Sequence, residues 1–230
     1  MKKWPIFIIL LLIAVAVGAS AQTQLTLGGS DSGQTISFNS PGANQSISMS
    51  FSGSCSVPGA GSQSACMSGL GALHNPPAAD AGGNYYMWMT GGGPSLTQIS
   101  AGNYGINMNS STFNYLWSAQ NGSVAGTINL TGAMQVPGYN QVFFVGRLDV
   151  TSSTGAYSTL FPVGNQNLDI TFYLNSGTIS LDTLWAQGGT ASGYLSSGEV
   201  VPVVPEPASM VLLGSGLLAA GSMFKFRRRK

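Results

Sequence analysis

The sequence predicts an all-β fold: an antiparallel β-sandwich or jelly-roll-like ectodomain, flanked by an N-terminal signal peptide and a C-terminal transmembrane helix. Three observations predict the β class. Apolar and polar residues alternate in many short runs, as in strands that bury one face. Gly, Asn and Ser separate the runs and favour turns. Between the two ends no stretch keeps helical spacing over three turns, and no internal repeat supports a solenoid or propeller instead.

The first predicted hairpin joins two runs that alternate strictly. In residues 35–38 Ile36 and Phe38 alternate with hydroxyl side chains, and in residues 46–51 every second residue is serine. Residues 39–44 lie between them and are rich in Asn, Pro and Gly, which favour a turn. We therefore expect two paired strands with one apolar face and one hydroxyl-bearing face.

Further along the chain, residues 71–83 are expected to form an irregular connection, because their Pro and Gly content suits neither a helix nor a strand. The segment Gln141–Val150 is apolar on both faces around Phe143 and is expected at the centre of a sheet. Strands are predicted at Tyr85–Met89, Ser95–Ile99, Tyr104–Met108, Thr112–Trp117, Ser123–Leu130, Gln141–Val150, Leu168–Leu174 and Thr178–Trp185.

The last two of these strands are predicted to form a hairpin. Ile170 and Phe172 share one face of the first strand, and residues 175–177, Asn-Ser-Gly, form a typical turn before the second. The folded domain is expected to occupy residues 22–192. Residues 193–204 show no pattern that would pack, which predicts a flexible linker.

The N-terminus has the pattern of a signal peptide over residues 1–21. Lys2 and Lys3 precede an apolar run, Ile6–Val17, and Ala19 and Ala21 form the small-x-small site of signal peptidase. Cleavage there would leave Gln22 as the first residue. An uncleaved N-terminal anchor is the alternative, although the apolar run is short for a membrane span.

The C-terminus combines an uncharged apolar run with a basic end. Residues 208–224 would extend roughly 25 Å as a helix, which approaches the thickness of a bilayer core. Prolines just before this run favour a helix that starts after them. A cluster of positive charges resists crossing the membrane and keeps the end of the chain in the cytoplasm. This cluster consists of Lys225, Arg227, Arg228, Arg229 and Lys230.

Residues 205–230 resemble the PEP-CTERM sorting signal of Gram-negative bacteria. The matching features are Pro205, Glu206 and Pro207, the apolar helix, and the basic end. The resemblance implies that an exosortase, a membrane-embedded cysteine transpeptidase, recognises the tail and cuts it near the Pro-Glu-Pro sequence. Before processing, the helix would hold the chain in the membrane. An ordinary membrane anchor with a chance Pro-Glu-Pro sequence is the alternative.

Charge is divided unevenly along the chain. Between the two apolar ends Arg147 is the only basic residue, against six carboxylates, which gives residues 22–204 a formal charge of −5. Such a surface does not neutralise phosphates, so nucleic acid is not expected as a partner, and attraction to anionic lipid is disfavoured.

Cys55 and Cys66 bracket a loop rich in Gly, Ser and Pro. In an oxidising compartment they are expected to form a disulfide, which stabilises the fold by roughly 3 kcal/mol in the chain-entropy model. Metal binding is the competing interpretation. It needs more ligands than these two thiols and the single histidine, His74, supply, so no metal or other cofactor is expected.

The sequence does not predict an enzyme. His74 is expected in the irregular connection of residues 71–83, and no serine has a recognisable nucleophile motif. A carboxylate set of Asp149, Asp169 and Asp182 would suit a secreted glycoside hydrolase, if these residues converge in a cleft. A structural calcium ion at these residues or at Asp31 is a further alternative.

Phe113, Tyr115 and Trp117 share one face of a predicted strand. If that face is exposed, its rings would form a sugar-stacking platform and the protein would be a carbohydrate-binding module; if it is buried, the rings are core. Our main expectation is an exported protein of the cell envelope or extracellular matrix, anchored through its C-terminal helix or released after processing. The resemblance further implies a structural role or an association with exopolysaccharide.

Overall fold

Strands dominate the structure, a computed structural model that describes residues 24–30, 34–74, 82–136, 138–175 and 180–201. These residues belong to one unit of the chain, Gln22–Pro202. The strands are β1 (Gln24–Ser30), β2 (Thr35–Ser40), β3 (Ile47–Ser52), β4 (Cys55–Val57), β5 (Gly61–Gln63), β6 (Cys66–His74), β7 (Gly83–Thr90), β8 (Ser95–Ser100), β9 (Asn103–Asn107), β10 (Thr112–Ala119), β11 (Gly122–Gln135), β12 (Gln141–Ser153), β13 (Gly164–Leu174) and β14 (Gly189–Val201). Two short helical segments, η1 (Gly155–Tyr157) and α2 (Leu181–Gln187), complete the described elements.

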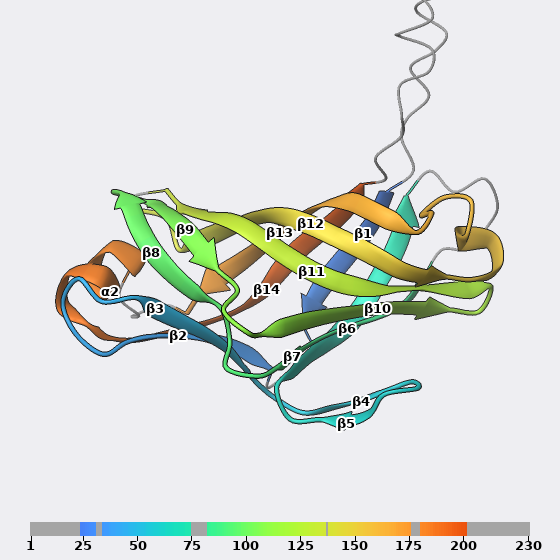
Figure 1. Cartoon of the computed structure of the whole chain (residues 1–230), viewed down its shortest axis with the longest axis horizontal. Helices are drawn as coiled ribbons and strands as arrows, with labels where there is room; N and C mark the ends of the chain where they lie inside the picture. Colours follow the sequence, from blue (N-terminus) through green and yellow to red (C-terminus); the bar gives the residue numbers. More distant parts are fainter. Residues whose placement is uncertain (1–23, 31–33, 75–81, 137, 176–179, 202–230) are drawn as a thin grey trace, which may run out of the picture. The chain divides into compact units, whose positions relative to one another are not determined.

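Four long neighbouring strands, β11 to β14, organise a twelve-stranded antiparallel sheet. The first part of β11 pairs with β10 and its last part with β9. In the same way, β14 pairs with β2 through residues 189–193 and with β1 through residues 198–200. Two closed rings of strands therefore share β11 to β14 (Figure 1). One ring is completed by β1, β6, β7 and β10, and the other by β2, β3, β8 and β9.

The all-β prediction is confirmed, and its sandwich form is corrected. A β-sandwich or jelly-roll has two separate sheets packed face to face. Here hydrogen bonds join the twelve strands into one sheet, and each of those strands has a neighbour on both sides. Among the described residues, unpaired edge is therefore limited to short stretches, such as the part of β8 beyond Leu96, where its pairing with β3 ends.

The core lies inside the two rings. As predicted, β2 and β3 pair antiparallel, with buried Phe38 opposite buried Met49. The ring of Phe144, on β12, lies 6.2 Å from that of Phe38 and 5.5 Å from that of Phe172. These contacts join the long strands to β2 across the core. Burying each such side chain contributes about 2 kcal/mol to folding.

Strand β12 lies between β11 and β13, the central position that the sequence predicts. Only one of its faces is fully buried, however. Val142 and Phe144 are buried, whereas Phe143 is half-buried and Val145 is 49% exposed. The outer face of β12 remains partly exposed, because an antiparallel sheet needs to cover only one of its faces.

The predicted hairpin of Leu168–Leu174 with Thr178–Trp185 is wrong in its second strand. The first is part of β13, but residues 181–187 form helix α2, and β13 pairs with β12 and β14 instead. Ser180 caps the helix by accepting a hydrogen bond from the Thr183 amide, and Gly188 follows its last residue. Leu181 and Leu184, three residues apart, are the buried side chains of this helix.

The prediction that residues 193–204 form a flexible linker is also wrong, for residues 193–201. Strand β14 covers Gly189–Val201, and Leu195 and Val200 are fully buried. Glycine at 193 is required by close packing, because a Cβ atom there would lie 2.3 Å from the Tyr173 carbonyl oxygen. A strand that is rich in small residues and closes two rings has little apolar alternation, which explains the error.

The start of the predicted irregular connection is strand: residues 71–74 belong to β6, which pairs with β1 and β7. Its last residue, Gly83, begins β7, while residues 75–81 lie outside the described residues. The predicted disulfide between Cys55 and Cys66 is confirmed. It joins the small β4–β5 hairpin to β6, with the two Cα atoms 5.8 Å apart.

Candidate functional site

The aromatic stripe of β10 is core. Phe113, Tyr115 and Trp117 are at most 1% exposed. Phe113 packs edge-on against Phe51 at 5.3 Å, and Trp117 packs edge-on against Tyr157 at 4.6 Å. The hypothesis that these three rings stack on a sugar at the surface is therefore wrong, and the alternative, that they form core, is correct.

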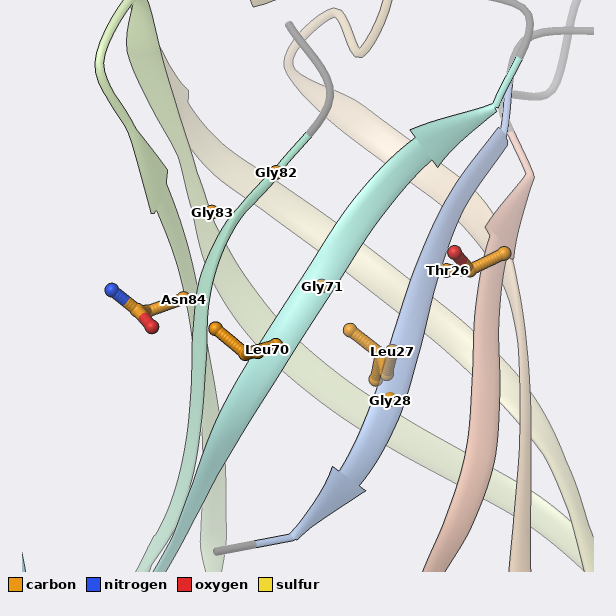
Figure 2. A pocket seen from close by; sticks show the side chains of 8 residues that line it. All are labelled: Thr26, Leu27, Gly28, Leu70, Gly71, Gly82, Gly83 and Asn84. Atoms are coloured by element: carbon orange, nitrogen blue, oxygen red, sulfur yellow. The ribbon is translucent and has the colours of Figure 1, made fainter.

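A groove with an estimated volume of about 590 Å³ lies over β1, β6 and β7, close to Trp117. Figure 2 shows its lining residues on three adjacent strands: Thr26, Leu27, Gly28, Leu70, Gly71, Gly82, Gly83 and Asn84. Glycine is needed at two of these positions. A Cβ atom on Gly71 would lie 2.9 Å from Trp117 Nε1, and one on Gly83 would lie 2.9 Å from Trp117 Cε2.

This groove offers little chemistry. Half of its lining residues are glycines, and none of the eight has a titratable side chain. Leu70, 72% exposed, and Asn84 supply its exposed side chains. A groove lined largely by backbone and without an acid, base or nucleophile has no group that performs a reaction. We assign no function to it.

The three aspartates suggested for hydrolysis do not converge. Asp149 and Asp169 are exposed on β12 and β13, whereas Asp182 lies in α2. In the strand register Asp149 is opposite Asn165 and Asp169 is opposite Val145, so the two are roughly 13 Å apart along the strands. They do not form the facing pair in a cleft that glycoside hydrolysis requires.

Asp182 instead fastens α2 to the β8–β9 turn. Its carboxylate accepts hydrogen bonds from the Gly102 amide at 2.9 Å, from Gln98 Nε2 at 2.6 Å, and from the Tyr104 hydroxyl. Burial alone would raise the pKa of Asp182, but the hydrogen bonds from Tyr104, Gly102 and Gln98 outweigh it and lower that pKa. Burial, followed by the bond to Asp182, raises the pKa of Tyr104 far above its usual range.

Replacing Asp182 with Asn is expected to lower the free energy of unfolding by about 2 kcal/mol at neutral pH, because the amide cannot accept all these bonds. The folded-state pKa of Asp182 lies below its unfolded value. Its stabilisation is therefore present above the unfolded pKa, about 3.9, and is lost as the pH falls through the folded value. Urea unfolding of the wild type and variant at pH 7 and pH 3 should show the difference shrinking at pH 3.

The matched control for this experiment is Asp149→Asn, which changes an exposed carboxylate on β12. It should alter the free energy of unfolding by less than about 0.5 kcal/mol. A difference between wild type and Asp182→Asn that stays constant from pH 7 to pH 3 would contradict the assigned network.

A second depression, with an estimated volume of about 570 Å³, gathers three tyrosines at one end of β12, β13 and β14. Its lining residues are Gly138, Tyr139, Asn140, Tyr173, Leu174, Asn175 and Tyr194, and we call it the tyrosine depression. Tyr173 and Tyr194 are directly opposite each other on β13 and β14, with ring centroids 5.9 Å apart and planes 25° apart. Tyr139 is 64% and Tyr194 46% exposed.

Buried Gln135, at the end of β11, fixes the backbone near Tyr139. Its side-chain amide donates to the Tyr139 carbonyl at 3.0 Å, and its side-chain oxygen accepts from the Leu181 amide at 2.7 Å. The neighbouring Leu174 amide donates to the Asn140 carbonyl at 2.6 Å. The side chain of Gln141 donates a hydrogen bond to the Tyr173 hydroxyl. The depression is thus held by hydrogen bonds on several sides.

The sequence analysis does not identify the tyrosine depression. One signal was available: the predicted inward face of residues 168–174 contains Ile170 and Phe172, which places Tyr173 on the outward face. A single exposed aromatic residue is common on protein surfaces, so this signal alone does not indicate a binding surface. Tyr173 contacts Tyr194 because β13 pairs with β14. Residues 193–204 are predicted to be a linker, so this contact is not expected from the sequence.

The predicted processing residues lie outside the described residues. These are Ala19 and Ala21 at the N-terminus, Pro205, Glu206 and Pro207, and the basic cluster that begins at Lys225. In the described part of the chain, no helix has the length and apolar character of a membrane span. The signal peptide, the transmembrane helix and the basic end remain predictions from the sequence.

Comparison with known proteins supports the assignment of the tail. A family model described as the PEP-CTERM protein-sorting motif matches residues 203–230. No curated protein and no solved structure matches the chain. The resemblance found in the sequence is confirmed for this segment. The motif implies an extracellular protein that is processed by an exosortase, exported, and associated with the cell envelope.

Proposed function

We propose that this chain is a structural or exopolysaccharide-associated protein of the cell envelope or extracellular matrix, and that it is not an enzyme. Signal peptidase removes residues 1–21, and the C-terminal helix holds the chain in the membrane until an exosortase processes it. The single observation that supports this proposal best is the match of residues 203–230 to the PEP-CTERM sorting motif.

The described domain is compatible with an extracellular structural role. A disulfide links Cys55 to Cys66, which suits an oxidising compartment. The sheet has a hydrogen-bonded neighbour on both sides of each of its twelve strands, and such closure prevents edge-to-edge aggregation outside the cell. The outward side chains of β2 and β3 are mainly hydroxyls and amides, which favour contact with hydrated polymers.

Sorting is tested by changing the basic cluster in the cells that make the protein. Replacing Arg227, Arg228, Arg229 and Lys230 together with Gln removes the charge that stops translocation. The processed form should fall from the main species to a minor one, while a longer form accumulates. An immunoblot gives the proportions, and intact-mass spectrometry of each species shows where both ends were cut.

The matched control is Arg147→Gln, which neutralises the one basic residue between the apolar ends. Its processing should equal that of the wild type. An unchanged mass and proportion of the processed form in the quadruple variant would refute exosortase sorting through this tail. A wild-type protein with both ends intact in the cytoplasm would refute export as well.

A further inference from the structure

We propose that the tyrosine depression binds an uncharged segment of a polysaccharide. This inference deepens the proposed association with exopolysaccharide and rests on it, because it names the surface of the described domain that binds and the class of ligand. Its ligand class follows from the three features of the depression argued below: the aromatic rings, the uncharged polar groups and the fixed geometry.

Aromatic rings in a fixed orientation form the first feature. Tyr173 and Tyr194 lie nearly parallel, with planes 25° apart, on adjacent strands. Tyr194 nevertheless stays 46% exposed, and Tyr139 stays 64% exposed across the depression. An exposed tyrosine ring packs against the C–H face of a pyranose, and its hydroxyl hydrogen-bonds in the same contact. Two exposed rings at one depression, with half-buried Tyr173 as the stacking partner of Tyr194, suit contact with a sugar chain.

The polar groups of the depression form the second feature. Asn140 and Asn175 line it beside the tyrosines, and the Asn175 side chain donates a hydrogen bond to the Ser192 hydroxyl at 3.0 Å. Side-chain amides and phenols both donate and accept hydrogen bonds, which matches the paired donor and acceptor character of sugar hydroxyls. These polar groups therefore suit a hydroxyl-rich ligand better than a purely apolar one.

Absence of charge narrows the ligand class. None of the seven lining residues is basic or acidic. Anionic polymers such as nucleic acid or acidic polysaccharide gain affinity from Lys and Arg, which the lining does not supply. An extended peptide that adds a strand needs a free sheet edge, and β13, which carries Tyr173 and Leu174, is already paired with β12 on one side and β14 on the other. A neutral polysaccharide needs neither basic side chains nor a free sheet edge.

Preorganisation is the third feature. Tyr173 and Tyr194 stand on paired strands, Gln141 bonds the Tyr173 hydroxyl, and buried Gln135 holds the Tyr139 carbonyl at 3.0 Å. The rings of Tyr173 and Tyr194 and the backbone at Tyr139 therefore need little further ordering, and preorganised sites lose less affinity to conformational entropy. The volume, about 570 Å³, lies within the range of small-ligand sites.

The test uses the protein isolated from the cells that make it, in native gels cast with one polymer each. The polymers are a β-1,3-glucan, a β-1,4-mannan, an α-1,4-glucan and, as an anionic comparison, polygalacturonate. We expect at least one neutral polymer to retard the protein. Tyr194→Ala and Tyr139→Ala should each weaken that retardation about tenfold in apparent affinity, and Tyr194→Phe, which keeps the ring, should weaken it less.

Ile99→Ala is the matched control, because Ile99 is 76% exposed and does not line the depression. It should bind as the wild type does. Circular dichroism and the urea midpoint must be the same in all variants, which is expected for exposed side chains. Retardation by no polymer, retardation by polygalacturonate alone, or binding that survives Tyr139→Ala and Tyr194→Ala would overturn the proposal. Tail processing is measured by mass spectrometry and polysaccharide binding by gel retardation. The sorting proposal and the binding proposal can therefore each fail without the other.

Discussion

Replacing Trp117 with Ala is expected to lower the free energy of unfolding by about 4 kcal/mol. The indole is fully buried, packs against Tyr157 at 4.6 Å, and lies against Gly71 and Gly83. Its removal loses the burial of a large apolar group and leaves a cavity that the surrounding strands fill only in part. Urea unfolding followed by far-ultraviolet circular dichroism measures the change. Domains have a total free energy of unfolding of only about 5–15 kcal/mol, so this loss is a large fraction of the total.

Trp117→Phe is the informative companion variant. No described residue accepts a hydrogen bond from Trp117 Nε1, so loss of this donor should cost little, and the phenyl ring keeps part of the contact with Tyr157. We expect a loss of about 1–2 kcal/mol. If the free energy of unfolding of Trp117→Ala instead lies within about 1 kcal/mol of the wild-type value, the placement of the indole in the core is refuted.

Removing the disulfide is expected to lower the free energy of unfolding by roughly 3 kcal/mol. The double variant Cys55→Ser, Cys66→Ala opens a loop with a sequence separation of 11 between the two cysteines. Without the cross-link, the unfolded chain gains conformational freedom that the folded state does not share. The far-ultraviolet spectrum should remain that of a β protein, since the main sheet does not include the β4–β5 hairpin.

Ser56→Ala serves as the control for this experiment, because it changes an exposed residue of the same hairpin without touching the cross-link. It should unfold like the wild type. Reduction of the wild-type protein should reproduce the loss seen in the double variant. Equal midpoints for oxidised wild type, reduced wild type and double variant would show that the disulfide adds no stability.

The parts of the fold that the sequence predicts are those where one face of a strand is apolar. In β2 and β3, strict alternation predicts both the strands and their inward faces, and Ile36, Phe38 and Met49 are all buried. Leu168, Ile170 and Phe172 on β13 behave in the same way. Period-two alternation predicts these elements because each depends on its own burial and little on its partners.

Other elements depend on partners that no local pattern reveals. In residues 181–187, Leu181 and Trp185 fit a strand period and a helix period equally well, and the Ser180 cap decides for a helix. Strand β14 has small residues at 193 and 198 because it packs closely against β13 and β1. Sheet closure arises from pairings between distant segments, which alternation within one segment does not specify.

The tyrosine depression is another feature that no pattern within a single segment reveals. Phe113, Tyr115 and Trp117 attract notice because three aromatics share a face, yet that face is inward. Tyr139, Tyr173 and Tyr194 are separated by many residues and meet only because β12, β13 and β14 are neighbours. A sequence pattern identifies a row of rings within one strand, whereas a site assembled across strands requires the register.

The position of β14 has a consequence for the timing of folding. This last strand hydrogen-bonds to β13, to β2 and to β1, the first described strand. One ring closes through residues 189–193 of β14 and the other through residues 198–200, so neither ring can close before β14 is available. Native contacts of such high sequence separation form slowly. The sorting motif begins at residue 203, two residues after the end of β14. The strand that completes both rings is therefore the element directly before the segment that the exosortase processes.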